Sequence, residues 1–233
     1  MALNGLDAIL FDKDGTLFDF TASWAGWTDR LLRHMATGQG VSAETLAAAV
    51  GFDLQTGRFA PDSGVIAGTV DDCADLLQPH LPNMARQDLI AHLNATATEA
   101  PMVPATPLAP LFDQLRSHGL ALGVATNDSE TAARAHLTRA GVLERFTQVL
   151  GYDSGYTPKP APDMLLGFAA RTGLRPARIA MVGDSLHDLH AGRAAGMQTI
   201  AVLTGAADAR SLAPHADAIL PDIGHLPRWL QIL

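Results

Sequence analysis

Cysteine is nearly absent from the sequence, since Cys73 is the only one in 233 residues. A single cysteine excludes an internal disulfide and any metal site built from several cysteines. Nothing around Cys73 forms a Cys/His pair, so we interpret it as a small core residue rather than a nucleophile. The fold must then depend on its apolar core, and a chain of this length buries roughly 70–75% of the surface that it exposes when unfolded.

Lysine is also scarce, because the 16 basic residues are 14 arginines and two lysines, Lys13 and Lys159. The net charge is −8 and no Lys/Arg-rich run is present, which argues against a general affinity for nucleic acid. A residue this rare is not general surface charge when it falls inside a motif.

Long apolar runs and targeting signals are missing as well. No run approaches the ~18–20 residues of a membrane span. The start "MALNGLDAIL" has no basic region, so we do not interpret it as a signal peptide and expect a cytoplasmic protein. No G-x-G-x-x-G follows the first predicted strand, which argues against a dinucleotide-binding oxidoreductase.

Helix and strand patterns alternate from about residue 104 onward. Helices are predicted at 106–119, 129–141, 161–173 and 188–196, and strands at 120–127, 146–151, 177–185, 198–203 and, as a short edge strand, 217–221. The strands are continuously apolar, which indicates a parallel sheet covered on both faces. Together with the apolar run before Asp12, they predict an α/β fold with a Rossmann-like parallel sheet core.

Residues 19–103 differ, with helical patterns at about 22–36, 43–50, 69–77 and 83–99 and no strong strand. A helical insert after the first strand is best interpreted as an all-α cap over the sheet. The turn after Asp19 and the Pro-rich residues 100–107 would be its hinges. We therefore predict a core of residues 1–18 and 104–233 and a cap of residues 19–103 that determines substrate specificity.

Polar side chains gather at the ends of the predicted strands: Asp12, Asp14, Thr126, Asn127, Lys159, Asp184 and Asp188. Each alone could be a turn, cap or surface residue. Ligands of open parallel sheets bind where the carboxyl ends of the strands converge, so these residues are expected to share one edge. Clustered carboxylates repel unless a cation offsets them, and Mg²⁺ prefers such oxygen ligands. With Lys159 and the Thr126 hydroxyl added, the set predicts a phosphoryl-transfer site.

Four motifs resemble, in order and spacing, those of the haloacid dehalogenase (HAD) superfamily of phosphohydrolases: "DKDGT" at 12–16, "TN" at 126–127, "KP" at 159–160 and "GDSLHD" at 183–188. The resemblance covers about residues 5–18 and 104–205, and the helical insert is similar to the small α-helical cap of that family. The phosphoglycolate-phosphatase-like subgroup is the most similar.

The resemblance implies roles for these residues. Asp12 would be the nucleophile that forms an aspartyl-phosphate, and Asp14 the general acid and base. Thr126 and the Asn127 backbone N–H would bind the transferring phosphoryl group, whose charge Lys159 would neutralise. Mg²⁺ would be held by the Asp12 carboxylate, the Asp14 main-chain carbonyl and Asp184, with Asp188 binding directly or through water.

Lys13 departs from the family pattern, since an apolar residue is usual between the two acids. Strand alternation places its side chain opposite those of its neighbours, so we expect it to point away from the site. The carboxylate at position 14 argues against the dehalogenase members, which lack an acid there.

The cap is expected to select the substrate. Arg58, on a turn-rich stretch, is the candidate for binding a substrate carboxylate, which would suit 2-phosphoglycolate. Its alternative is a solvated loop charge. Trp24 and Trp27 could line the pocket, although packing within the cap is the favoured interpretation.

Two rival functions stay open at this point. A phosphosugar mutase similar to β-phosphoglucomutase would pass the phosphoryl group to a sugar, and a phospho-accepting signalling domain would keep it. The sequence predicts a small phosphomonoester as partner, no nucleic acid and no membrane, and either a monomer or a homodimer.

Overall fold

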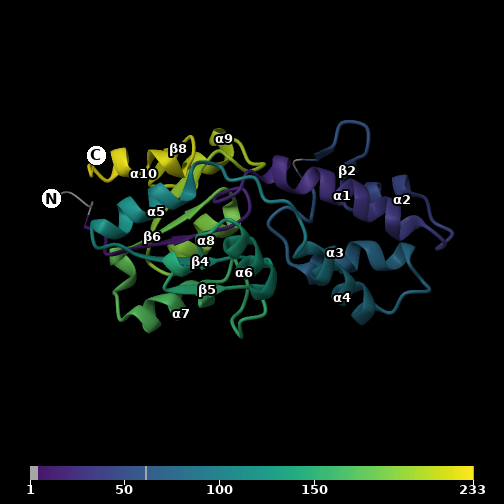
Figure 1. The fold of residues 1–233 in the computed structure, drawn as a ribbon, viewed down its shortest axis with the longest axis horizontal. Helices are drawn as coiled ribbons and strands as arrows, with labels where there is room; N and C mark the ends of the chain where they lie inside the picture. The colour runs from purple at the N-terminus through teal and green to yellow at the C-terminus, as the bar shows by residue number, and fades with distance from the viewer. Residues whose placement is uncertain (1–4, 61, 233) are drawn as a thin grey trace.

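A six-stranded parallel sheet forms the centre of the larger lobe in the computed structural model, which describes residues 5–60 and 62–232 (Figure 1). The strand order is β5-β4-β1-β6-β7-β8, and every neighbouring pair is parallel. The strands are β1 (Ala8–Phe11), β4 (Ala121–Ala125), β5 (Gln148–Leu150), β6 (Ile179–Gly183), β7 (Gln198–Val202) and β8 (Ala218–Leu220). The predicted α/β fold class is confirmed, and β8 is the edge strand that the sequence predicts.

Helices cover both faces of this sheet: α5 (Leu108–Ser117), α6 (Glu130–Arg139), α7 (Asp163–Thr172), α8 (Leu186–Ala194), α9 (Ala209–Leu212) and α10 (Leu226–Trp229). Strand β1 shows why its sequence is continuously apolar. Phe11 packs in the cluster that contains Phe112, whereas Leu10 packs in the cluster that contains Phe168 on the other side. Successive side chains of a strand point to opposite faces, and here both faces are buried.

A second lobe contains α1 (Phe20–Ala36), α2 (Ala43–Ala49), α3 (Val70–Leu77) and α4 (Arg86–Ala97) (Figure 1). We call residues 20–97 the cap. It has its own apolar cluster, which includes Leu46, Leu77 and Leu89. The chain passes between the lobes beside Asp19, whose N–H donates to the Val103 carbonyl at 2.9 Å. Asp19 also begins α1, because its side chain accepts a hydrogen bond from the Ala22 N–H.

The cap also contains a short hairpin that the sequence did not predict, formed by β2 (Phe52–Asp53) and β3 (Arg58–Phe59). Strands of two residues are too short to show an alternating pattern. The rings of Phe52 and Phe59 pack across the pair with centroids 4.8 Å apart.

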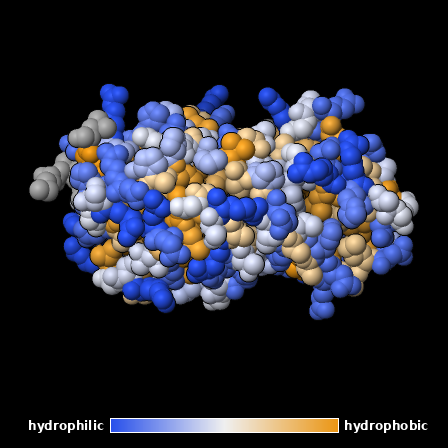
Figure 2. All heavy atoms as spheres, viewed as in Figure 1, coloured by the Kyte–Doolittle hydropathy of each residue, from blue (hydrophilic) through white to orange (hydrophobic). Residues whose placement is uncertain are grey.

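The surface of both lobes is mainly hydrophilic on the face shown, with hydrophobic residues in separate patches (Figure 2). In the described part of the chain, no helix combines the length and the apolar composition that a membrane crossing needs.

Phe112 should carry a large share of the stability of the sheet core. Its ring is fully buried and packs against Phe11 and Phe146, with centroids 5.6 and 5.0 Å away. We expect Phe112→Ala to lower the free energy of unfolding by about 3–5 kcal/mol, because it leaves a cavity. Urea unfolding measures this, and Leu166→Ala, at a side chain 42% exposed, is the control that should change it by less than about 1 kcal/mol. Equal effects of the two substitutions would contradict the prediction.

Candidate active site

Lys159 lies between two carboxylates at the carboxyl edge of the sheet. Its Nζ is 2.6 Å from Asp12 Oδ1 and 2.6 Å from Asp188 Oδ1. Asp12 directly follows β1, Asp188 lies in the first turn of α8, and Lys159 comes from the loop between β5 and α7. Residues far apart in the sequence thus meet at the edge where the sequence analysis expects them, and all three are buried.

Negative charge exceeds positive charge in this cluster. Burial raises the pKa of Asp12 to about 7, and Lys159 offsets this only in part. Burial also raises the pKa of Asp184 well above its usual range, with further raising by Asp12 and Asp188. Burial alone would lower the pKa of Lys159, but Asp12 and Asp188 raise it above its usual range, so this lysine stays charged. A further cation would stabilise all three carboxylates.

The residues fit a magnesium ion. Asp12, Asp184 and Asp188 each offer an oxygen, and these atoms lie within 4.8 Å of one another. The backbone at Gly15 and Gly205 lies so close to the Asp184 carboxylate that a Cβ at either position would overlap it. Thr16 Oγ1 donates to Asp184 Oδ1 at 3.3 Å. Carboxylate oxygens are the ligands that Mg²⁺ prefers, and three carboxylates with one lysine leave negative charge for it to balance. Ligation by the main-chain carbonyl of Asp14 stays a prediction.

Asp188 combines two roles that the sequence analysis treats as alternatives. Its Oδ2 accepts hydrogen bonds from the N–H and hydroxyl of Ser185, at 3.1 and 2.7 Å, and completes a capping box at the start of α8. Its Oδ1 binds Lys159. The helix start therefore fixes the carboxylate that faces the lysine.

Asn127 fixes the loop that carries Lys159. Its Oδ1 accepts from the Lys159 N–H at 3.0 Å, and its Nδ2 donates to the Lys159 carbonyl at 2.8 Å. The same Nδ2 donates to the Ala67 carbonyl of the cap at 2.8 Å. Neighbouring Thr126 is buried, and its hydroxyl accepts from the Asp128 N–H at 3.1 Å. Their phosphoryl-binding roles stay predictions, since these contacts show how both are oriented.

Lys13 is fully buried beside the second acid rather than in the cavity. Its Nζ lies 2.7 Å from Asp14 Oδ1, 3.0 Å from Asp128 Oδ2 and 3.1 Å from His136 Nδ1. Lys13 does not line the cavity, but it does not point away from the site as expected, because its ammonium reaches the Asp14 carboxylate. Burial alone would lower the pKa of Lys13, whereas Asp14 and Asp128 raise it above its usual value.

Asp128 and His136 belong to the site although the sequence did not single them out, and Trp24 contacts the second acid. The Trp24 Nε1–H donates to Asp14 Oδ1 at 2.8 Å, and its ring lies over the Lys13 ammonium at 5.4 Å. Trp24 and Trp27 both line the cavity between core and cap, instead of only packing within the cap. Asp128 directly follows the "TN" motif, and this position was the available signal. Nothing in the sequence of α6 distinguishes His136 from an ordinary helix residue.

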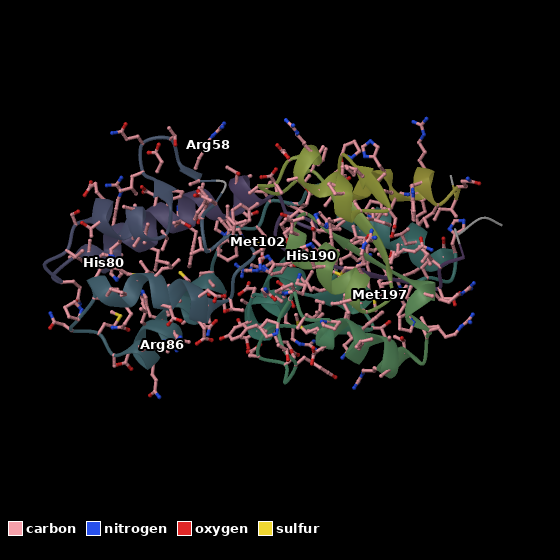
Figure 3. All side chains as sticks on the ribbon, turned by 180° about the vertical axis from the view of Figure 1, so that it is seen from behind. Arg58, His80, Arg86, Met102, His190 and Met197 are labelled. Carbon is pink, nitrogen blue, oxygen red and sulfur yellow. The ribbon has the colours of Figure 1, made fainter. Side chains whose placement is uncertain are left out.

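Arg58 lies on β3 at the outer edge of the cap, where its side chain is exposed (Figure 3). The main cavity is lined by its neighbour Phe59, whereas Arg58 lines a shallower hollow on the hairpin. Its role in binding substrate stays a prediction, and this position gives no support to it.

Replacing Lys13 should destabilise the protein strongly. Lys13→Met leaves Asp14 and Asp128 without their buried counter-ion, so we expect the free energy of unfolding to fall by about 3–5 kcal/mol. Arg86→Met is the matched control, because Arg86 also pairs with two carboxylates, Asp71 and Asp75, but at an exposed position. That change should lower the unfolding free energy by about 1 kcal/mol or less. Chemical denaturation measures the unfolding free energy of both variants. A Lys13→Met protein as stable as Arg86→Met would refute the expectation.

His136 should make stability depend on pH. Its pKa is lowered from 6.5 to about 4, mainly by burial and also by the nearby Lys13 and Arg139, whereas Asp14 and the Ala97 carbonyl oppose the shift. Between pH 4 and pH 6.5 the unfolded chain therefore binds a proton at His136, whereas the folded protein does not. Stability from the neutral ring is complete above pH 6.5 and is lost as the pH falls toward 4, by up to about 3 kcal/mol. Unfolding free energies of wild type and His136→Gln across pH 4–7 should converge as the pH falls; parallel curves would exclude the effect.

Comparison with known proteins agrees with the site. Residues 9–202 match the family model of the haloacid dehalogenase-like hydrolases. A phosphoglycolate phosphatase of Nitrosospira multiformis is 27% identical over 227 residues, which cover 97% of this chain and 96% of that protein. A phosphoglycolate phosphatase of Rhodospirillum rubrum is 30% identical over 227 residues, covering 96% and 90%. The crystal structure of a predicted phosphoglycolate phosphatase from Haemophilus somnus has a TM-score of 0.72 at 20% identity, covering 97% and 98%.

The family match spans both halves of the core and the cap between them. The solved structure supports the fold, a parallel sheet with an inserted helical cap. The four sequence motifs lie at one edge of that sheet, as their resemblance implies. The chain belongs to the haloacid dehalogenase-like hydrolase family.

Proposed function

We propose that the protein is a Mg²⁺-dependent phosphomonoester hydrolase that works through an aspartyl-phosphate intermediate. The observation that supports it most is the buried Asp12 carboxylate, bonded to Lys159 and grouped with Asp184 and Asp188. Full-length relatives named phosphoglycolate phosphatase support the same reaction class. Mg²⁺, when bound by these carboxylates, would offset negative charge on the transferring phosphoryl group.

Asp12 and Asp14 divide the reaction into two displacements. A carboxylate oxygen of Asp12 attacks phosphorus, the bond from phosphorus to the ester oxygen breaks, and Asp14 gives a proton to the leaving alcohol. Asp14 then takes a proton from water as the water oxygen attacks phosphorus. The bond between Asp12 and phosphorus breaks, inorganic phosphate leaves, and both acids return to their first state.

The contacts of Asp14 suit a group that exchanges protons. Lys13 and Trp24 both hold Oδ1, and Oδ2 makes no hydrogen bond with the described residues. One oxygen therefore fixes the orientation, while the other is available for the proton. Because Trp24 belongs to α1, the cap takes part in setting this orientation.

The substrate is the finer part of the proposal. 2-Phosphoglycolate is the ester that the sequence resemblance suggests, and it is the substrate named for several relatives. Its carboxylate needs a cationic partner in the cap, and Arg58 was the candidate. 2-Phosphoglycolate therefore belongs first in a substrate panel, beside esters that lack a carboxylate.

Release of inorganic phosphate from such a panel, with and without Mg²⁺, tests the proposal. We expect Mg²⁺-dependent release that falls at least about 10³-fold in Asp12→Asn, because an amide is a poor nucleophile. Asp113→Asn changes an exposed acid on α5, away from the site, and is the control; it should leave the rate unchanged. An isomerised ester without free phosphate would indicate a mutase instead. Stable phosphorylation without turnover would indicate a signalling role, and no reaction at all from folded protein would overturn the proposal.

A further inference from the structure

We infer that the esters hydrolysed at this site carry an uncharged, apolar leaving group; the inference rests on the proposed function. A cavity of about 160 Å³ lies between the edge of the sheet and the cap. Its core end contains the acids and Lys159, where a phosphoryl group would bind. Its cap end has a different chemistry, and that end would hold the leaving group.

Aromatic and branched aliphatic side chains dominate the cap end: Trp24, Trp27, Phe59, Val65, Ile66 and Val70. They come from α1, from β3, from the loop between β3 and α3, and from the start of α3 itself. The cap thus presents apolar surface toward the cavity from several elements. An apolar group that leaves water for this surface binds favourably, in proportion to the area that it buries.

Positive charge is scarce in the lining. Among the described residues that line the cavity, Lys159 is the one lysine or arginine, and it is already paired with Asp12 and Asp188. His187 is the one histidine among the described residues of this lining. A carboxylate on the leaving group would be buried without a cationic partner, which is strongly unfavourable.

At the cap end, Asn94 places an unpaired acceptor beside the cavity. Asn94 Nδ2 donates to the Tyr152 hydroxyl at 3.1 Å. Asn94 Oδ1 is buried and has no hydrogen-bond partner among the described residues. Its partial negative charge beside the cavity disfavours a carboxylate there.

The cavity volume sets the size of the leaving group. An engineered apolar cavity of about 150 Å³ in another protein binds benzene. A volume of about 160 Å³ that also holds the phosphoryl group therefore limits the leaving group to one ring or a short branched chain at most.

Two esters of the same shape test the inference directly. Isobutyl phosphate has two methyl groups where 2-phosphoglycolate has its two carboxylate oxygens. We expect kcat/KM for isobutyl phosphate to exceed that for 2-phosphoglycolate by at least about ten-fold. In a series of n-alkyl phosphates, kcat/KM should rise about four-fold per added methylene until the cavity is filled, which corresponds to ~0.8 kcal/mol per methylene. Equal or better hydrolysis of 2-phosphoglycolate would overturn the inference and leave the phosphatase proposal intact.

A charge placed in the cap end should reverse this preference. Ile66→Arg puts a guanidinium at a half-buried lining position, and Leu166→Arg places the same group at an exposed position of α7 as the matched control. The first should raise kcat/KM for 2-phosphoglycolate relative to isobutyl phosphate at least ~30-fold, and the second should leave the ratio unchanged. An unchanged ratio in folded Ile66→Arg would contradict the inference.

Binding separates this inference from the proposed reaction. Trp24 and Trp27 line the cavity, so tryptophan fluorescence of Asp12→Asn protein should report ester binding without turnover. Benzyl phosphate should bind at least ~10-fold more tightly than 4-carboxybenzyl phosphate. If they bind equally, the inference fails; if binding differs as expected but no variant releases phosphate, the hydrolase proposal fails alone.

Discussion

The ammonium group of Lys159, held between Asp12 and Asp188, is the interaction on which the site depends. It joins the end of β1, the start of α8 and the loop before α7, which are separated by most of the sequence. Removing one partner from a buried ion pair costs about 3–5 kcal/mol, because the other charge stays buried and unpaired. The sheet edge therefore keeps its acids close together only because the lysine, and in the proposed reaction Mg²⁺, lies among them.

Lys13, the residue after Asp12, forms a second buried lysine–carboxylate cluster. It too lies between two carboxylates, those of Asp14 and Asp128, and it is fully buried. The two lysines serve separate acids, since Lys159 contacts Asp12 and Asp188 whereas Lys13 contacts Asp14 and Asp128. Lys159 stabilises the residue that attacks in the proposed reaction, and Lys13 orients the residue that would move protons. Trp24, on α1 of the cap, contacts both Asp14 and Lys13 and so connects the cap with this pair.

The sequence predicted the fold well because the sheet has a strong local signal. Continuous apolar strands between capped helices indicate a buried parallel sheet, and polar residues after each strand indicate one shared edge. Asp12, Lys159, Asp184 and Asp188 were found in this way, and the structure brings them together.

Contacts between distant side chains left no such signal. The bond from Trp24 to Asp14, and the burial of His136 beside Lys13, depend on how α1 and α6 pack against the strand end. The charge of Arg58 in a turn-rich stretch favours a binding role, but the hairpin orients it to the outer edge, and Phe59 lines the cavity instead.

Both lysines of the chain are buried in one small region, and this affects how the molecule meets amine-directed chemistry. The positive charge on its described surface comes from arginine and, where protonated, histidine, because neither lysine side chain reaches solvent appreciably. Acylating or cross-linking reagents that attack ε-amino groups would find them only after the sheet edge opens. Lysine modification of this protein would therefore report the opening of its site rather than the exposure of its surface.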